Sequence, residues 1–251
     1  YYAGALERPG SNAEYQLVDA RIAALAPLSL SAAEAAALPL TAITAWELLF
    51  DRLGVSEGGG EGQTLLVVGA AGGVGSILVQ LARQLTKLTV VATAARAESV
   101  EWVKGLGAHH GIDHRQPLLP QLQALGIKEV ELIASLTHTD QHFPQYGDCI
   151  APQGRLGVID DFGPLDMSVL KRKCASFHWE FMFTRAMFAA EMPRQGEILD
   201  QLRTLVDAGT IQSTVSEGLG PINANNLKTA HRKLESGQTI GKLVLAGWEN
   251  N

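Results

Sequence analysis

The sequence predicts an α/β fold built on a doubly wound parallel sheet. Hydrophobic residues make up 46% of the 251 residues and charged residues 18%, which is the composition of a compact globular chain. From Gln63 onward, short apolar runs alternate with amphipathic helical segments, an alternation typical of parallel sheets. A glycine-rich turn follows the first of these apolar runs. At about 150 residues per domain, the length corresponds to one or two domains.

Charge and cysteine content exclude several classes of protein. The net charge of −6, from 20 basic and 26 acidic residues, argues against a nucleic-acid partner, because such partners are held through neutralised phosphates. The two cysteines, Cys149 and Cys174, cannot form a disulfide framework or an all-cysteine zinc site. We therefore expect a reducing, cytoplasmic setting.

No membrane partner is expected either. A membrane-spanning helix needs roughly 20 apolar residues without charges, and the alanine-rich run 32–45 is interrupted by Glu34 and Pro39. The N-terminal Tyr1–Gly4 carries no basic segment and is unlike a signal peptide. Because it has the character of a strand entering a turn, we expect the sequence to begin within a domain.

The first part of the chain is expected to contain strands and turns. Arg8–Asn12 is a turn cluster, and Tyr15–Val18 has the pattern of an extended segment. Ser31 and Glu34 form a predicted capping box that opens a short helix. A second helix is predicted from Thr41 to Leu53.

The middle of the chain contains the predicted parallel sheet. Apolar runs of strand length are found at Leu65–Val68, Thr89–Thr93, Gly111–Asp113, Val130–Ala134, Gly154–Ile159 and Ser176–Phe181. Helical patterns between them cover Val74–Leu85, Ala97–Leu106, Leu118–Leu125 and Asp140–Ile150. Toward the C-terminus we predict helices at Gly196–Ala208 and Asn223–Leu234 and strands at Ser213–Leu219 and Lys242–Leu245.

The most informative motif is the glycine-rich turn at residues 69–75. It joins the apolar strand Leu65–Val68 to a helical segment, so its backbone N–H groups would face a diphosphate at the positive end of the helix dipole. Ala70 replaces the first glycine of the usual dinucleotide fingerprint, so the pattern alone is weak, but its strand-to-helix context is the one required. The alternative is a tight turn that binds no ligand.

The end of the second strand indicates which dinucleotide is preferred. An acidic side chain there would bond the ribose 2′-OH of NAD, whereas a basic one accommodates a 2′-phosphate. The segment Ala92–Arg96 contains no acid, and Glu98 is the first one encountered. We therefore predict NADPH as cofactor. The alternative is that Arg96 is only a solvated residue of the next helix, and even then the missing acid weakens the case for NAD.

No catalytic metal is expected from the histidines. His110 and His114 are separated by a predicted strand, over which residues four apart lie about 13 Å from each other, and His138 and His142 span a helix start. They are better interpreted as polar residues at strand ends beside a cofactor. The aromatic run 177–183 fits an apolar pocket near the nicotinamide as well as it fits a core or subunit contact.

Blocks along the whole chain resemble the medium-chain dehydrogenase/reductase superfamily. The similarity is to its zinc-independent quinone oxidoreductase branch, in the group often labelled zinc-type alcohol dehydrogenase-like. The blocks that carry it, in family order, are 10–15, 37–47, 70–75, 106–108, 112–114, 151–155 and 241–245.

The resemblance implies a Rossmann cofactor domain inserted into a partial GroES-like β domain. The Rossmann domain would span residues 43–210, and the GroES-like part would comprise residues 1–42 and 211–251. The family's first, strand-rich stretch would precede Tyr1. Members of the family often pair through the edge of the cofactor sheet, so a homodimer is also implied.

The resemblance also assigns cofactor-binding roles to particular residues. Those around the pyrophosphate, the adenosine phosphate, the nicotinamide and the cleft would be Thr44, Gly72, Gly73, Val74, Gly75, Thr93, Arg96, His114, Ser135, Leu136, Thr137, Ile159, Asp160 and Lys242. At His114 the family more often has a tyrosine.

The activity implied is hydride transfer from NADPH to a quinone or an α,β-unsaturated carbonyl, with the protein supplying orientation, exclusion of water and polarisation. The sequence identifies no proton donor, and no catalytic residue is assigned. Two alternatives remain: a zinc-dependent alcohol dehydrogenase, and an NADPH-binding structural or regulatory protein without turnover.

Overall fold

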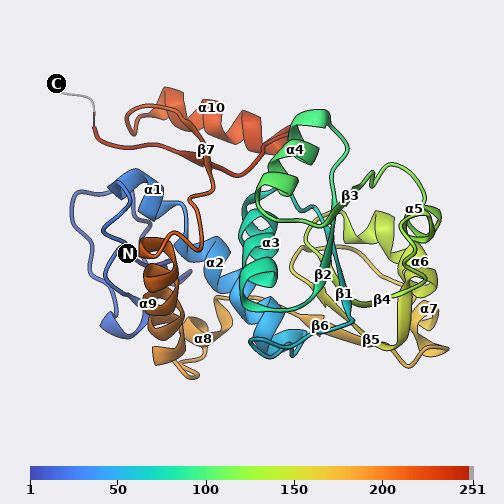
Figure 1. Ribbon diagram of the computed structural model, residues 1–251. Helices are drawn as coiled ribbons and strands as arrows, with labels where there is room; N and C mark the ends of the chain where they lie inside the picture. Colours follow the sequence, from blue (N-terminus) through green and yellow to red (C-terminus); the bar gives the residue numbers. More distant parts are fainter. Residues whose placement is uncertain (249–251) are drawn as a thin grey trace. The chain divides into compact units, whose positions relative to one another are not determined.

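The computed structural model describes residues 1–248, which form two compact units (Figure 1). Unit 1 contains residues 1–44 and 181–248, and unit 2 contains residues 45–180. Across the described residues, no helix has both the length and the apolar character needed to cross a membrane.

Unit 2 is built on a six-stranded sheet with the order β3-β2-β1-β4-β5-β6, in which every neighbouring pair is parallel. Its strands are β1 (Thr64–Val68), β2 (Thr89–Thr93), β3 (His110–Ile112), β4 (Val130–Ser135), β5 (Ile150–Val158) and β6 (Ser176–Trp179). The order reverses between β1 and β4, and in open α/β sheets ligands bind at that reversal, beyond the carboxyl ends of the strands. The predicted doubly wound Rossmann-type sheet is confirmed.

Helices cover both faces of this sheet, with α3 and α4 on one side and α5, α6 and α7 on the other (Figure 1). Their bounds are α3 (Gly73–Leu85), α4 (Ala97–Gly105), α5 (Leu118–Ala124), α6 (Thr139–Cys149) and α7 (Ser168–Lys171). All five residues of β1 are buried, as expected for a central strand covered on both faces. Leu66 and Val68 of β1 pack in one core cluster with Phe143 and Tyr146 of α6.

The helix predicted from Thr41 to Leu53 has a different form. It begins earlier, as α2 (Pro39–Trp46), and continues as a π-helix, η2 (Glu47–Arg52). Its Leu48 packs against β5 where Gly157 leaves room, since a Cβ on Gly157 would lie 2.4 Å from the Leu48 side chain. The wider turn of a π-helix changes the residue period, which a helical pattern in the sequence does not reveal.

Unit 1 gathers both ends of the described chain. Its elements are η1 (Ala20–Ile22), α1 (Ala32–Ala36), most of α2, α8 (Thr184–Met187), α9 (Pro193–Asp207), β7 (Val215–Gly218), α10 (Ala224–Glu235) and β8 (Lys242–Val244). The capping box of Ser31 and Glu34 forms as predicted. Tyr15–Val18 forms no strand, contrary to the expectation.

Residues 181–210, which we expected with the cofactor domain, cluster in unit 1 instead. Helix α9 accounts for this placement. A Cβ on its Gly196 would lie 2.6 Å from the Arg21 carbonyl oxygen, and the Tyr1 hydroxyl donates to the Leu199 carbonyl at 2.7 Å. The helix is thus packed closely against the N-terminal segment.

The edge strand β6 carries part of the aromatic run. Trp179 stacks on Phe162 with ring centroids 4.9 Å apart, and Phe177 meets Trp179 edge-on at 5.3 Å. These rings therefore pack on one another along the edge of the sheet. Trp179 is still half exposed, and the expected homodimer stays a prediction.

Candidate functional site: a dinucleotide cradle at the sheet reversal

The glycine-rich turn begins directly where β1 ends, beside the point where the strand order reverses. Gly69 has φ +83°, a left-handed conformation that favours glycine. Its N–H donates to the Thr93 hydroxyl at 3.1 Å, and its carbonyl accepts from the Gly72 N–H at 3.2 Å. The first bond holds the turn against the end of β2, and the second closes the turn on itself.

Gly75 keeps the turn tight against the first turn of α3. A Cβ there would lie 2.5 Å from the Ala70 carbonyl oxygen, a backbone atom that cannot move aside easily. Gly72 is the N-cap of this 13-residue helix and provides no side-chain capping bond. The first N–H groups of α3 are thus available to an anion, next to the positive end of the helix dipole. Gly72, Gly73, Val74 and Gly75 fit a dinucleotide diphosphate.

The loop after β2 presents Arg96 as the N-cap of α4. The Arg96 N–H donates to the Ser99 hydroxyl at 3.2 Å, and that hydroxyl donates to the Arg96 carbonyl at 2.9 Å. Residue 96 is therefore fixed at a helix start, one strand away from the glycine turn. No carboxylate precedes it in the loop, as the sequence indicated.

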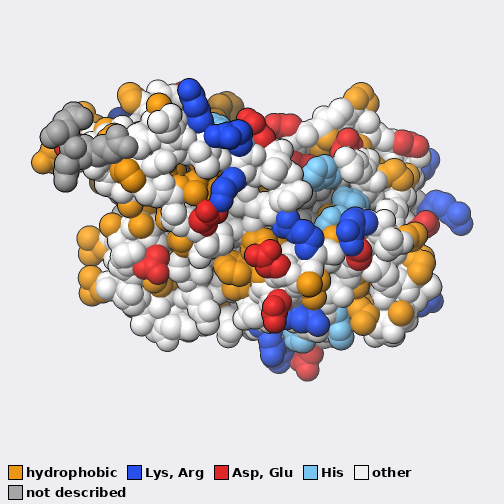
Figure 2. All heavy atoms as spheres, turned by 90° about the horizontal axis from the view of Figure 1, so that it is seen from above, with side chains coloured by type: hydrophobic (Ala, Val, Ile, Leu, Met, Phe, Trp, Pro, Cys, Tyr) orange, Lys and Arg blue, Asp and Glu red, His pale blue; other side chains and the backbone are white. Residues whose placement is uncertain are grey.

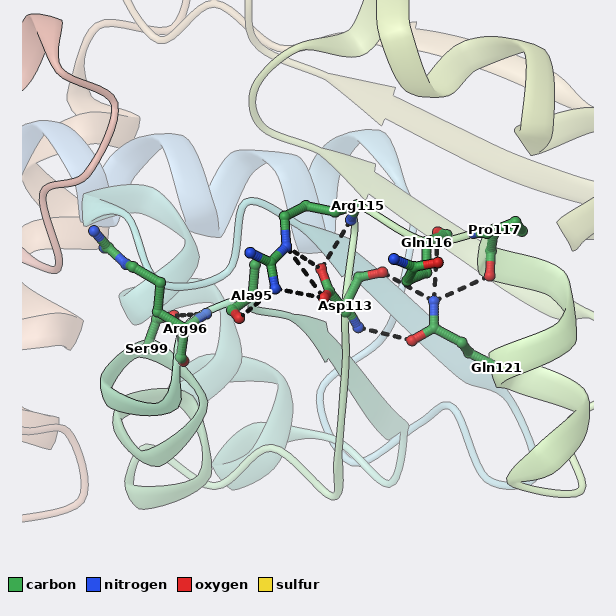
Figure 3. A network of polar contacts seen from close by, with 8 residues as sticks. All are labelled: Ala95, Arg96, Ser99, Asp113, Arg115, Gln116, Pro117 and Gln121. Carbon is green, nitrogen blue, oxygen red and sulfur yellow. Dashed lines mark hydrogen bonds and ion pairs between the residues drawn. The ribbon is translucent and has the colours of Figure 1, made fainter.

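The loop after β3 contains an ion pair that does not stand out in the sequence. Arg115 bonds both carboxylate oxygens of Asp113, and its Nη2 also donates to the Ala95 carbonyl at 2.9 Å (Figure 3). The Arg115 hydrogen bonds lower the pKa of Asp113 to about 2. The only sequence signal for this pair is the Asp-x-Arg spacing, which also occurs at Asp19 and Arg21 and is not specific.

His114 and His142, which belong to different histidine pairs in the sequence, lie close together beside the loop after β3. The rings of His114 and His142 meet edge-on with centroids 6.1 Å apart, and Figure 2 shows histidine side chains beside basic side chains on the face seen from above. The buried Nδ1 of His114 has no hydrogen-bond partner among the described residues. Burial lowers the pKa of both His114 and His142, which favours neutral rings at pH 7.

Metal-binding side chains do not gather into a centre in the part of the chain that the structure describes. Over residues 1–248, no three His, Cys, Asp or Glu side chains form a group that could hold a metal ion.

The ends of β4 and β5 are joined by a buried hydrogen-bond network. The Ser135 hydroxyl lies 2.7 Å from both the Thr139 and the Tyr146 hydroxyls. Asp160, just beyond β5, accepts from the Thr139 N–H at 3.0 Å and from the Thr139 hydroxyl. Ser135 and Asp160 thus hold the two strand ends and the start of α6 in place, and a contact of either with a cofactor stays a prediction.

The remaining predicted residues fall into two groups. Leu136, Thr137 and Ile159 follow β4 and β5, and Thr137 lies against the glycine turn, since a Cβ on Gly69 would be 2.8 Å from its methyl group. Thr44 and Lys242 belong to unit 1, so their part in this site stays a prediction. The Thr44 hydroxyl donates to the Leu40 carbonyl at 2.8 Å, and burial lowers the pKa of Lys242.

A buried acidic pair lies at the end of β6, and nothing in the sequence indicates it. Glu180 follows the strand with a fully buried side chain, and its Oε2 accepts from Arg52 Nε at 2.9 Å. Burial, and next the neighbouring Glu47, raise the pKa of Glu180 to about 8. Glu47 is also buried and belongs to the π-helix η2.

Three comparisons place the chain among known proteins. Residues 106–245 match the zinc-binding dehydrogenase family. A zinc-type alcohol dehydrogenase-like protein of Staphylococcus aureus strain MSSA476 is 38% identical over 249 residues, which cover 98% of this chain and 74% of that protein. A crystal structure of a candidate zinc-dependent alcohol dehydrogenase from Rhizobium etli CFN 42 is 52% identical with a TM-score of 0.95, covering 99% of this chain and 73% of that one.

A more distant relative carries a named activity. The chloroplastic NADPH-dependent alkenal/one oxidoreductase of Arabidopsis thaliana is 29% identical over 246 residues, which cover 96% of this chain and 55% of that protein.

Proposed function

Because this chain belongs to the zinc-type alcohol dehydrogenase-like family of the medium-chain dehydrogenase/reductase superfamily, a family of oxidoreductases, we propose that it uses NADPH to reduce a quinone or an α,β-unsaturated carbonyl. The observation that carries the proposal is the uncapped glycine turn, Gly72–Gly75, at the reversal of the strand order. A diphosphate is the ligand that such a turn accommodates best.

The preference for NADPH is supported by charge at the second strand. Arg96 begins α4 and no acidic side chain precedes it, so a 2′-phosphate would meet a cation rather than a carboxylate. Asp113, the carboxylate at the end of the next strand, is paired with Arg115. The Arabidopsis relative is named as NADPH-dependent, which agrees with this preference.

The acceptor class is proposed from the family resemblance and from the alkenal/one activity named for that relative. When bound, NADPH supplies the hydride. The residues of this chain bind and orient it: the glycine turn holds the diphosphate, and the Ser135–Thr139–Asp160 network fixes the strand ends next to it. No side chain is assigned as proton donor.

Titration of the chain with NADPH and NADH, followed by nicotinamide fluorescence, tests the cofactor proposal. We expect tighter binding of NADPH than of NADH, and loss of that preference in Arg96→Ala. Arg203→Ala, at a half-buried arginine of unit 1, serves as a control for the loss of one positive charge. A folded chain that binds neither nucleotide would overturn the proposal.

Turnover distinguishes the remaining alternatives. NADPH oxidation that depends on added quinone or enone supports the reductase, whereas tight NADPH binding without such oxidation supports a structural or regulatory protein. Metal analysis of the purified protein tests the zinc-dependent alcohol dehydrogenase, which requires bound zinc for its activity.

A further inference from the structure

We infer that Arg115 is a positioning and specificity-determining residue for the 2′-phosphate end of the cofactor, an inference that rests on the proposed NADPH site. Arg115 lies in the loop after β3, next to the loop after β2 that carries Arg96. The two strands are paired, with Thr93 opposite Ile112, so both loops leave the same edge of the sheet side by side.

The Arg115 guanidinium ties these two loops together. Its Nε bonds the Asp113 carboxylate oxygens at 3.0 and 3.1 Å, and its Nη2 bonds Asp113 Oδ2 at 2.8 Å. The same Nη2 donates to the Ala95 carbonyl at 2.9 Å. One nitrogen atom therefore bridges the carboxylate of one loop and the backbone of the other.

The bridged carbonyl belongs to the peptide that leads directly into Arg96. The hydrogen bond from Arg115 to the Ala95 carbonyl therefore fixes the position of Arg96 and of the first turn of α4. In Figure 3 the Arg96 side chain extends away from the Arg115 guanidinium, whose donors face Asp113 and Ala95. Arg115 is thus placed to position Arg96 rather than to replace it.

Arg115 also controls the charge at this end of the site. Its hydrogen bonds lower the pKa of Asp113 to about 2, so Asp113 is a carboxylate at every working pH. An unpaired carboxylate at the end of a strand next to the ribose would bond the 2′-OH of NADH and repel the 2′-phosphate of NADPH. Pairing with Arg115 neutralises that charge.

The ion pair adds little to stability, because the Arg115 side chain is 61% exposed. Substitutions at residue 115 should therefore leave the protein folded. The chain also contains a matched control in unit 1, where Arg21 pairs with Asp19 through the same two-residue spacing and is 57% exposed.

The test measures binding of two adenosine fragments, 2′,5′-ADP and 5′-AMP, to the full chain by calorimetry. We expect Arg115→Ala to weaken 2′,5′-ADP on the order of tenfold, as one unit charge acting at surface dielectric would, and to change 5′-AMP little. Arg21→Ala should change neither. Adding Asp113→Asn to Arg115→Ala should recover part of the lost affinity, because it removes the carboxylate that the first substitution leaves without Arg115.

Three results would overturn the inference. Equal binding of 2′,5′-ADP by Arg115→Ala and the wild type would show that Arg115 has no role in binding the 2′-phosphate. An equal loss of affinity for both fragments would show that Arg115 only supports the fold in general. A double variant no better than Arg115→Ala would show that Asp113 repels no phosphate. If the wild type itself binds the two fragments equally while Arg115→Ala remains folded, the proposed NADPH preference is wrong. That result differs from the three that overturn the role of Arg115, so the failures of the two proposals can be told apart.

Discussion

The Thr93 hydroxyl, at the end of β2, accepts a 3.1 Å hydrogen bond from the Gly69 N–H, the first residue of the glycine turn. Thr93 is only 1% exposed. The hydroxyl therefore helps to fix the shape of the glycine turn, and the turn leads into α3, whose first N–H groups face the proposed diphosphate site. Thr93 thus supports the cradle, and its expected contact with the cofactor stays a prediction.

Thr93→Val should weaken NADPH and NADH by the same factor. Valine preserves the shape of threonine but leaves the half-buried Gly69 N–H without this acceptor, at a cost of up to about 1–3 kcal/mol. Because the diphosphate is common to both nucleotides, their ratio should stay constant. Fluorescence titration measures the two dissociation constants, and thermal unfolding measures the stability loss. Thr93→Ser keeps the hydroxyl and should behave like the wild type; a change in the NADPH to NADH ratio would contradict the supporting role.

Gly75→Ala should both destabilise the protein and impair nucleotide binding. The added Cβ would overlap the Ala70 backbone, and relief of such an overlap costs about 1–3 kcal/mol and moves the turn. Gly105→Ala is the matched control, because residue 105 ends α4 with open space around its Cβ position. That variant should bind nucleotide normally and be no less stable. Similar effects of the two substitutions would show that the tight contact at Gly75 has no role.

The sheet could be predicted from the sequence because its strands are short, apolar and separated by helices of regular period. The prediction was wrong where local residue types disagree with the tertiary structure. β5 begins at Ile150, not Gly154, since α6 leads straight into it, although Pro152, Gln153 and Gly154 have the character of a turn. Gln153 takes a left-handed φ of +62° within that strand.

The candidate site was predictable only where one short segment contains the whole feature. The glycine turn is such a segment. The bridge from Arg115 to Ala95 joins residues 20 apart, and the Arg52–Glu180 pair joins residues 128 apart, so both depend on strand pairing that spacing does not reveal. In the sequence, Glu47 has the character of an ordinary helical polar residue, and its burial in η2 depends on tertiary packing.

Asp160→Ala should destabilise the start of α6. The carboxylate accepts from the Thr139 N–H at 3.0 Å, which makes it the cap of a helix whose own N-cap residue, His138, provides no side-chain bond. Loss of such a cap costs about 0.5–2 kcal/mol, measurable as a lower unfolding midpoint in urea. Asp160→Asn retains an acceptor and should recover most of that loss. If Asp160→Ala is as stable as the wild type while binding of the nucleotide falls, Asp160 contacts the cofactor rather than supporting α6.

The wild type should become less stable as the pH rises from 6.5 to 8, and Glu180→Gln should remove this loss of stability. Burial, and next Glu47, raise the pKa of Glu180 to about 8 from an ordinary 4.5, so within this window the folded protein retains a proton that the unfolded chain has released. The free energy of unfolding therefore decreases as pH rises, by at most about 1.4 kcal/mol per pH unit for one proton. His114 and His142, whose pKa is lowered by burial, act in the opposite direction and mainly below pH 6.5.

Glutamine cannot release that proton but still offers Arg52 an acceptor at the position of Oε2. Urea unfolding at pH 6.5 and pH 8 should therefore show a smaller difference for Glu180→Gln than for the wild type. Glu217→Gln, which removes an exposed carboxylate paired with Lys233, controls for the change in net charge and should retain the wild-type difference. Equal pH differences for Glu180→Gln and the wild type would mean that Glu180 is already ionised at pH 6.5, with Arg52 outweighing both burial and Glu47.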